Sequence, residues 1–245
     1  MFISLCREVF LLSVPDKKKI HHVFNEIAPT YDLVNSILSM GIDKHWRHQV
    51  IHKVPQNTPL SILDIATGTG EQILSILQAR EQVVAVGIDT ATHMLEKARS
   101  KAQAARLHNR IAFEEADALD LPFANHSFDM VTISFGIRNV ASLQECFKEI
   151  YRVLKPGGTL LILEFSLPTN FWVKKGYLFY LRHLLPGIGK LISKHPTAYT
   201  YLNQTIEAFP YGKELCQLLE KEGFTATYQP YTLGIASLYT ATTSH

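Results

Sequence analysis

Short runs of β-branched and aliphatic residues alternate along this chain with longer segments in which apolar residues recur every three or four positions. The runs predict strands, and the longer segments predict helices. We expect strands at residues 61–65, 83–88, 111–115, 130–134, 159–164, 225–229 and 237–240, and helices at residues 71–78, 92–106, 142–152 and 213–222. This alternation is typical of a parallel sheet with crossover helices on both faces.

The last two predicted strands, 225–229 and 237–240, are joined by a short loop. A loop of this length cannot hold the crossover that a parallel pair requires, so these strands predict an antiparallel hairpin. We therefore expect an α/β, Rossmann-like fold. Its sheet is seven-stranded and mostly parallel, with an antiparallel edge strand.

The first predicted strand ends in a glycine turn, residues 66–70, that leads directly into a helix. Nucleotide-binding α/β domains open in this way, because glycines let the backbone approach a ligand closely. Asp89 ends the second strand about 20 residues beyond the loop, where such folds place the carboxylate that holds ribose hydroxyls. A nucleoside-containing cofactor is therefore the first hypothesis.

The residues around the turn narrow the choice of cofactor. Ile73 stands where a dinucleotide fingerprint requires a third glycine, and no Lys-Ser or Lys-Thr pair follows to hold a triphosphate. Asp64 adds a carboxylate before the glycines, which suits a cationic ligand. S-adenosylmethionine fits this pattern, with contacts at Asp64, Thr67, Gly68, Thr69, Gly70 and Asp89. The alternative is a simple strand-to-helix turn with Asp89 as a helix cap.

Polar residues also follow the third and fourth predicted strands. Asp117 and Ala118 are suited to the adenine edge, and Ser134 leads into a loop that contains Arg138 and Asn139. Ligands of open α/β sheets lie across the carboxyl ends of the strands, so we expect these residues to share one site. The alternatives are a helix cap for Asp117 and a surface salt bridge for Arg138.

Composition excludes several classes of function. The 245 residues, 47% of them apolar, can build one large domain, and the net charge of +2 predicts no nucleic-acid partner. Three cysteines without metal spacing and no His-Glu-x-x-His helix predict no metal site and a cytoplasmic location.

Six stretches together resemble a known family: class I S-adenosylmethionine-dependent methyltransferases, and within them the ubiquinone/menaquinone biosynthesis C-methyltransferases (UbiE/MenG). The resemblance runs from about residue 18 to residue 241, and residues 134–139 and 163–166 are its most particular parts. The stretches are Val23-Phe-Asn-Glu-Ile-Ala-Pro-Thr-Tyr-Asp32, Leu63-Asp-Ile-Ala-Thr-Gly-Thr-Gly70, Ala116-Asp-Ala-Leu-Asp-Leu-Pro-Phe123, Thr132-Ile-Ser-Phe-Gly-Ile-Arg-Asn139, Arg152-Val-Leu-Lys-Pro-Gly-Gly158 and Leu163-Glu-Phe-Ser166.

This resemblance implies a class I methyltransferase fold with an N-terminal helical cap and an inserted helical lid. It implies a flexible extension at residues 1–17, then a single methyltransferase domain at 18–245 with substrate cap segments 18–55 and 168–206. The cofactor contacts that the resemblance implies are Thr69, Asp89, Asp117, Ala118 and Ser134.

The activity that the resemblance implies is methylation of a ring carbon of a prenylated quinol, foremost demethylmenaquinol. A 2-methoxy-6-polyprenyl-1,4-benzoquinol, another small phenolic acceptor and a catalytically silent S-adenosylmethionine-binding scaffold are the alternatives. We expect Arg138 to stabilise the developing phenolate and orient a water, with Asn139 beside it. Tyr31 is expected as a wall or hydrogen-bond donor and Asp32 as a proton acceptor; a core aromatic and a helix cap are the alternative.

No Asp or Glu occurs between Phe165 and Ile206, where bulky apolar residues alternate with lysines and arginines. This is the composition of an interfacial amphipathic element. We therefore expect peripheral contact through residues 171–194 with the inner face of a membrane. A lid or a homodimer contact is equally consistent with this composition.

Overall fold

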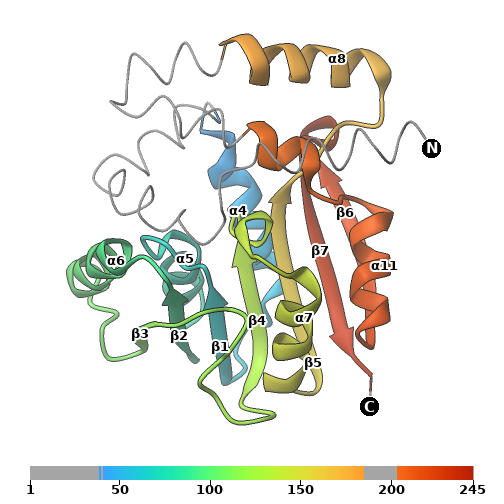
Figure 1. Cartoon of the computed structure of the whole chain (residues 1–245). Helices are drawn as coiled ribbons and strands as arrows, with labels where there is room; N and C mark the ends of the chain where they lie inside the picture. Colours follow the sequence, from blue (N-terminus) through green and yellow to red (C-terminus); the bar gives the residue numbers. More distant parts are fainter. Residues whose placement is uncertain (1–38, 40, 185–202, 245) are drawn as a thin grey trace.

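A single seven-stranded sheet organises the part of the chain that the computed structural model describes, residues 39, 41–184 and 203–244 (Figure 1). The strand order is β3-β2-β1-β4-β5-β7-β6. The strands are β1 (Leu60–Ile65), β2 (Val83–Asp89), β3 (Ile111–Glu115), β4 (Phe128–Ser134), β5 (Leu154–Phe165), β6 (Phe224–Tyr231) and β7 (Ala236–Thr243).

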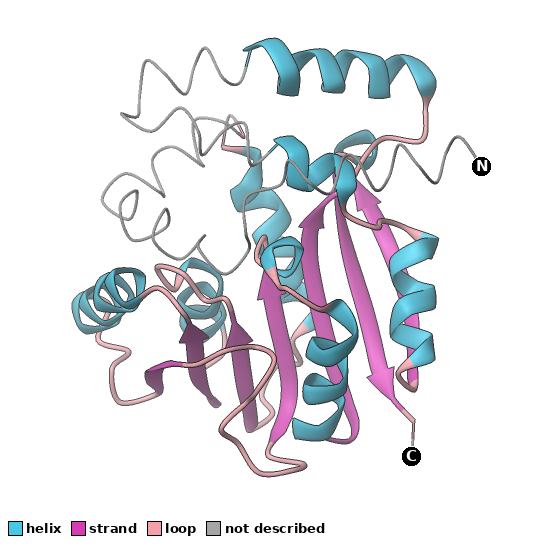
Figure 2. Cartoon of the chain, viewed as in Figure 1, coloured by secondary structure: helices cyan, strands magenta, loops and turns pink. Residues whose placement is uncertain are grey.

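Helices cover both faces of this sheet, as Figure 2 shows. On one face Trp46, Ile73 and Leu95 belong to one buried apolar cluster, and on the other Phe147 and Leu215 belong to a second. The labelled helices are α4 (Ile42–Lys53), α5 (Glu71–Ala79), α6 (Thr92–Ala104), α7 (Leu143–Val153), α8 (Phe171–Phe179) and α11 (Lys213–Lys221). Residues 203–208 are also helical, and η2 (Ile137–Asn139) and η4 (Thr232–Gly234) are short 3-10 helices, whereas η3 (Tyr180–Leu184) is a π-helix.

The pairing of the strands confirms the predicted fold class. Strands β1 to β5 pair in parallel, and β7 runs antiparallel to both β5 and β6. The predicted hairpin therefore forms the β6–β7 edge, with β7 as the reversed strand. From β1 the chain first adds strands on one side of the sheet, β2 and β3, and then continues on the other side with β4 and β5. Open α/β sheets bind ligands at this switch point, between β1 and β4.

Strand β5 begins earlier than the sequence pattern predicts. The Pro156-Gly157-Gly158 stretch, which separates the predicted helix 142–152 from the predicted strand 159–164, lies inside β5, because Leu154 already pairs with Phe128 and the register shifts before Thr159. Gly158 permits this irregularity: a Cβ there would lie 2.8 Å from the carbonyl oxygen of Lys155.

Several predicted features fall wholly or partly outside the described residues. The extension at 1–17 and the residues Tyr31 and Asp32 lie outside them entirely. Of the expected cap segments 18–55 and 168–206, the structure describes 39, 41–55, 168–184 and 203–206. In Figure 1 the described piece α8 lies beyond the carboxyl ends of the parallel strands β4 and β5.

Candidate cofactor and substrate site

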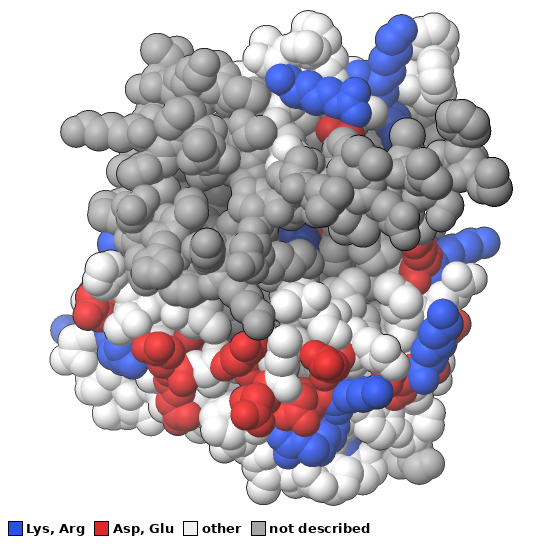
Figure 3. Space-filling model, in the orientation of Figure 1, with Lys and Arg blue, Asp and Glu red and all other residues white. Residues whose placement is uncertain are grey.

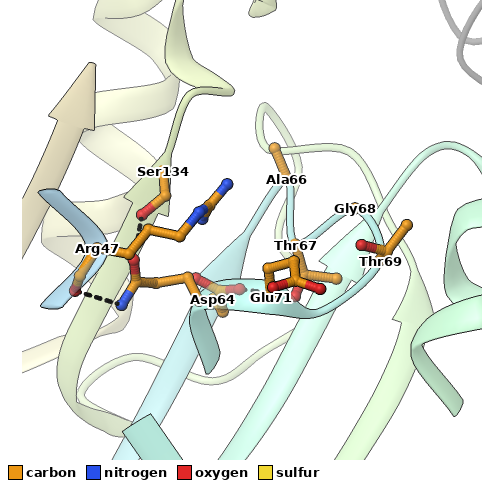
Figure 4. A pocket seen from close by; sticks show the side chains of 9 residues that line it. Arg47, Asp64, Ala66, Thr67, Gly68, Thr69, Glu71 and Ser134 are labelled. Carbon is orange, nitrogen blue, oxygen red and sulfur yellow. Dashed lines mark hydrogen bonds between the residues drawn. The ribbon is translucent and has the colours of Figure 1, made fainter. Parts of the chain in front are cut away.

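A pocket lies at the carboxyl ends of β1 and β4. The loop after β1 forms one side of the pocket, and residues from α4, α5 and β4 form the rest (Figure 4). Its lining residues are Arg47, Asp64, Ala66, Thr67, Gly68, Thr69, Glu71, Gln72 and Ser134. The structure thus brings the predicted glycine turn, Asp64 and Ser134 together.

The glycine turn keeps its backbone in conformations that few side chains accept. Gly68 and Gly70 have φ angles of +55° and +80°, and Gly70 directly precedes α5. The Gly68 amide donates to the Asp89 carboxylate at 2.8 Å, which fixes the loop against the end of β2. Gly68 and Gly70 therefore leave this side of the pocket without bulky side chains, which permits a ligand to approach the backbone closely.

Asp64 is a buried carboxylate at the floor of the pocket. The hydroxyls of Thr67 and Thr132 donate to it at 2.6 and 2.5 Å. Burial nevertheless raises the pKa of Asp64 to about 6, and these hydrogen bonds and the nearby charge of Arg47 offset only part of that effect. A cationic ligand group would restore the interactions that the carboxylate lost with water, so the site suits a cation.

Asp89 ends β2 next to the turn and is only partly exposed. Its two oxygens accept from the backbone amides of Gly68 and Ala91, the latter at 2.9 Å. Burial raises the pKa of Asp89, whereas these hydrogen bonds oppose the shift. A carboxylate oxygen has two acceptor positions, so Asp89 can also accept from ribose hydroxyls.

Asp117 and Ala118 lie on the far side of Asp89 from the glycine turn. The amide of Ala116 donates to the Asp89 carbonyl at 3.3 Å, which keeps the end of β3 beside the end of β2. Asp117 is exposed and accepts from the Leu119 amide at 3.0 Å, while Ala118 is buried. Asp117 and Ala118, predicted to bind adenine, therefore lie at the carboxyl ends of the strands together with Asp89, predicted to bind ribose.

Arg138 lies in η2, immediately after β4, and is almost completely buried. Its Nη1 donates to the Glu164 carboxylate and to the Phe135 carbonyl, both at 2.6 Å. Its Nε is buried and has no hydrogen-bond partner among the described residues, and its guanidinium lies 5.4 Å from the Phe165 ring centre. The ion pair is thus buried rather than at the surface.

Asn139, the next residue, is partly buried and also belongs to η2. Its backbone amide donates to the Gly136 carbonyl at 3.0 Å. Two residues separate this short 3-10 helix from the end of β4, so it lies at the same end of the sheet as the pocket.

Sequence reasoning missed three residues of the site. Gln72, which is buried, donates to the Arg47 carbonyl and accepts from the Ser134 hydroxyl, both at 3.3 Å, and so connects α4, α5 and β4. Glu164 is a carboxylate within an apolar strand, and a charged residue in such a strand could have indicated a buried charged partner or a functional role. Arg47 falls within the expected cap segment 18–55, but nothing in the sequence singled it out as a residue of the pocket.

Gly136 is needed for the loop after β4 to pack on the loop after β1. A Cβ at this position would lie 2.5 Å from the Cβ of Ala66, which itself has a φ of +52°. We expect Gly136→Ala to displace the glycine turn, weaken S-adenosylmethionine binding about tenfold and destabilise the protein by about 1–3 kcal/mol. Calorimetric titration and thermal unfolding measure these effects.

Gly176 provides the matched control for this prediction. A Cβ there has no neighbour within 4 Å, and the residue lies within α8. Gly176→Ala is expected to leave binding unchanged and to stabilise the helix slightly. Unchanged affinity in Gly136→Ala would show that the two loops can separate without moving the turn.

Comparisons with known proteins find similarity to methyltransferases. The sequence model of the ubiE/COQ5 methyltransferase family matches residues 12–243. A demethylmenaquinone methyltransferase of Porphyromonas gingivalis is 40% identical, over 92% of this chain and 93% of its own. A ubiquinone/menaquinone biosynthesis C-methyltransferase UbiE of Geotalea daltonii is 43% identical, over 91% of this chain and 95% of its own.

Solved structures share the fold. A SAM-dependent methyltransferase of Thermotoga maritima superposes with a TM-score of 0.64 at 19% identity, over 91% of this chain and 99% of its own. At this level of identity the likeness concerns the architecture of the sheet and its helices.

Proposed function

The chain belongs to the ubiE/COQ5 methyltransferase family, and we propose that it methylates a ring carbon of a prenylated quinol, with S-adenosylmethionine as methyl donor. Demethylmenaquinol is the acceptor we favour. The observation that carries this proposal is the 40% identity, over nearly the whole length of both chains, to a relative named demethylmenaquinone methyltransferase.

The residues of the pocket fit this methyl donor. We assign Asp64 to its amino group, because a buried carboxylate with a raised pKa is stabilised by a cation. The backbone of residues 67–70 would face the amino-acid end, Asp89 the ribose hydroxyls, and Asp117 and Ala118 the adenine, with Ser134 at the β4 side. When bound, the donor supplies an electrophilic methyl group, and these residues hold it in a fixed direction.

On the acceptor side we assign the main role to Arg138. A guanidinium does not act as a base at physiological pH, but its N–H groups can donate a hydrogen bond to a phenolate that forms on the quinol. The buried, unpartnered Nε supports this role, because it is a donor that the described protein does not use. Asn139 lies beside it, and Tyr31 and Asp32, outside the described residues, are proposed as a hydrogen-bond donor and a proton acceptor of a cap formed by residues 18–55 and 168–206.

Transfer of labelled methyl groups tests the proposed function. The protein would be incubated with labelled S-adenosylmethionine and, in parallel, reduced demethylmenaquinone or the reduced 2-methoxy-6-polyprenyl-1,4-benzoquinone. We expect label on the ring carbon of the naphthoquinol. Label on the benzoquinol alone would assign ubiquinone biosynthesis instead, and binding of the donor without label on either quinol would contradict quinol methylation.

We further propose that α8 rests on the surface of an anionic membrane, from which a prenylated quinol can enter the site. Phe171, Trp172 and Phe179 are more than half exposed, and at 100° per residue they fall within about 100° of one another around the helix. Lysine and arginine side chains lie over the same end of the molecule (Figure 3). No helix among the described residues is long and apolar enough to cross a membrane.

Tryptophan fluorescence measures this contact directly. The chain has two tryptophans, of which Trp46 is 2% exposed and Trp172 74% exposed, so a blue shift on adding vesicles reports on Trp172. We expect the shift with phosphatidylglycerol vesicles, a much smaller one with neutral phosphatidylcholine, and loss of binding in Phe171→Ala/Phe179→Ala. A shift that depends on protein concentration without vesicles would indicate a homodimer contact instead.

A further inference from the structure

Arg47 enters the cofactor pocket from α4, and its charge is opposite to that of Asp64 in the same pocket. Figure 4 shows its side chain extending between Ser134 and Ala66. The two charges interact: burial raises the pKa of the Asp64 carboxyl, and the positive charge of Arg47 lowers it. The pocket therefore presents a cation and an anion to one ligand.

The described protein makes little use of the Arg47 guanidinium. Its Nε is buried without a hydrogen-bond partner among the described residues. The Asp43 carboxylate is 4.0 Å from Nε, beyond hydrogen-bond distance, and accepts instead from the Ser39 hydroxyl at 2.6 Å. The ring of Phe135, 5.1 Å from the guanidinium carbon, supports the group from one side. An unused buried donor is unfavourable, so this arrangement favours an anionic ligand.

The second acidic residue in the lining, Glu71, is already neutralised. Lys101 of α6 forms an ion pair with Glu71 and also donates to the Thr69 hydroxyl at 3.1 Å. Asp64 and Arg47 therefore remain as the two charges of the lining that no other charged side chain pairs at hydrogen-bond distance.

We infer that Arg47 binds the α-carboxylate of S-adenosylmethionine, while Asp64 faces the α-ammonium group. The inference rests on the proposed function, because it requires this methyl donor. The amino-acid end of the donor carries one charge of each sign, which matches the two charges in the pocket. A planar guanidinium is also suited to a carboxylate, because two of its N–H groups can donate in parallel.

Binding of two donors that differ only in the carboxylate tests this inference. Arg47→Gln keeps much of the side-chain length and removes the charge. We expect its Kd for S-adenosylmethionine, measured by calorimetric titration, to rise at least tenfold, the scale of a lost charge-assisted hydrogen bond. Its Kd for decarboxylated S-adenosylmethionine, which keeps the ammonium and sulfonium groups, is expected to stay within about twofold of the wild-type value.

Lys53→Gln is the matched control, because it removes the same charge from an exposed position on the same helix. It is expected to leave both Kd values unchanged. If Arg47→Gln weakens both donors equally, Arg47 acts through its packing on Phe135 and the inference is overturned; unchanged binding of S-adenosylmethionine also overturns it. Wild-type protein that binds neither donor would instead overturn the proposed function.

Discussion

Replacing Arg138 with methionine is expected to lower the rate of quinol methylation about a hundredfold to a thousandfold, because a hydrogen-bond donor to the developing phenolate is lost. The same change leaves Glu164 buried without its cation. Breaking a buried ion pair in this way costs about 3–5 kcal/mol of the free energy of unfolding. The single variant alone therefore cannot separate chemistry from folding.

The double variant Arg138→Met/Glu164→Gln separates them. The glutamine oxygen can still accept from the Phe165 amide, which donates to the native carboxylate at 2.9 Å, and neither position of the former ion pair then carries a charge. We expect the double variant to recover most of the lost stability and to bind S-adenosylmethionine with nearly wild-type affinity, but to stay as inactive as the single variant. Urea unfolding, calorimetric titration and the methyl-transfer assay measure the three quantities.

Lys155→Met provides the control for loss of an ion-paired cation. Lys155 bonds to Asp129 at 2.7 Å, with 43% of its side chain exposed, and an exposed pair of this kind contributes about 0–1 kcal/mol. Recovery of activity together with stability in the double variant would show that Arg138 has only a structural role.

Asp64→Asn is expected to weaken S-adenosylmethionine binding about a hundredfold and yet to stabilise the ligand-free protein at neutral pH. The first effect follows from losing the carboxylate that faces the ammonium group. The second follows from linkage. The pKa of Asp64 rises from 3.8 to about 6 on folding, so the ionised carboxylate is less stable in the folded protein than in the unfolded chain. Asparagine carries no charge and removes this destabilisation.

The pH dependence of this second effect has a definite sign. Below about pH 4 Asp64 is protonated in the folded and in the unfolded protein, so it does not lower the free energy of unfolding. As the pH rises from about 4 to 6, ionisation of Asp64 lowers the free energy of unfolding progressively, and above that range the loss is complete. Each tenfold change in proton affinity corresponds to about 1.4 kcal/mol, so the full loss is about 3 kcal/mol. The stability of Asp64→Asn should therefore exceed that of the wild type increasingly from pH 4 to pH 7, in urea unfolding without ligand.

Asp129→Asn should show the opposite behaviour. Although partial burial raises the pKa of Asp129, hydrogen bonds from Lys155 and Ser61 hold it below its ordinary value. This carboxylate therefore stabilises the fold when ionised, and its replacement should cost stability at neutral pH. If Asp64→Asn instead destabilised the ligand-free protein at pH 7, the Asp64 carboxylate would have to be stabilised by its two threonine hydroxyls more than burial disfavours it.

The linear pattern of the chain determined the strands, the crossover helices and the terminal hairpin. Alternation of apolar runs and helical periodicity reflects which side chains are buried, and burial is what a sheet covered by helices requires. The same pattern placed Asp64, Asp89, Asp117 and Ser134 at strand ends, and parallel strands carry all such ends to one edge. The pocket was accessible from sequence for this reason.

Only the tertiary structure decided which charges meet. Arg138 pairs with Glu164 because β4 and β5 are adjacent, and Arg47 reaches the pocket because α4 packs beside α5. The start of β5 was likewise decided by the pairing of Leu154 with Phe128. Such contacts join residues far apart in the chain, whereas periodicity records only whether each residue is buried, so a single sequence determines the elements and their order but not the partners of their buried charges.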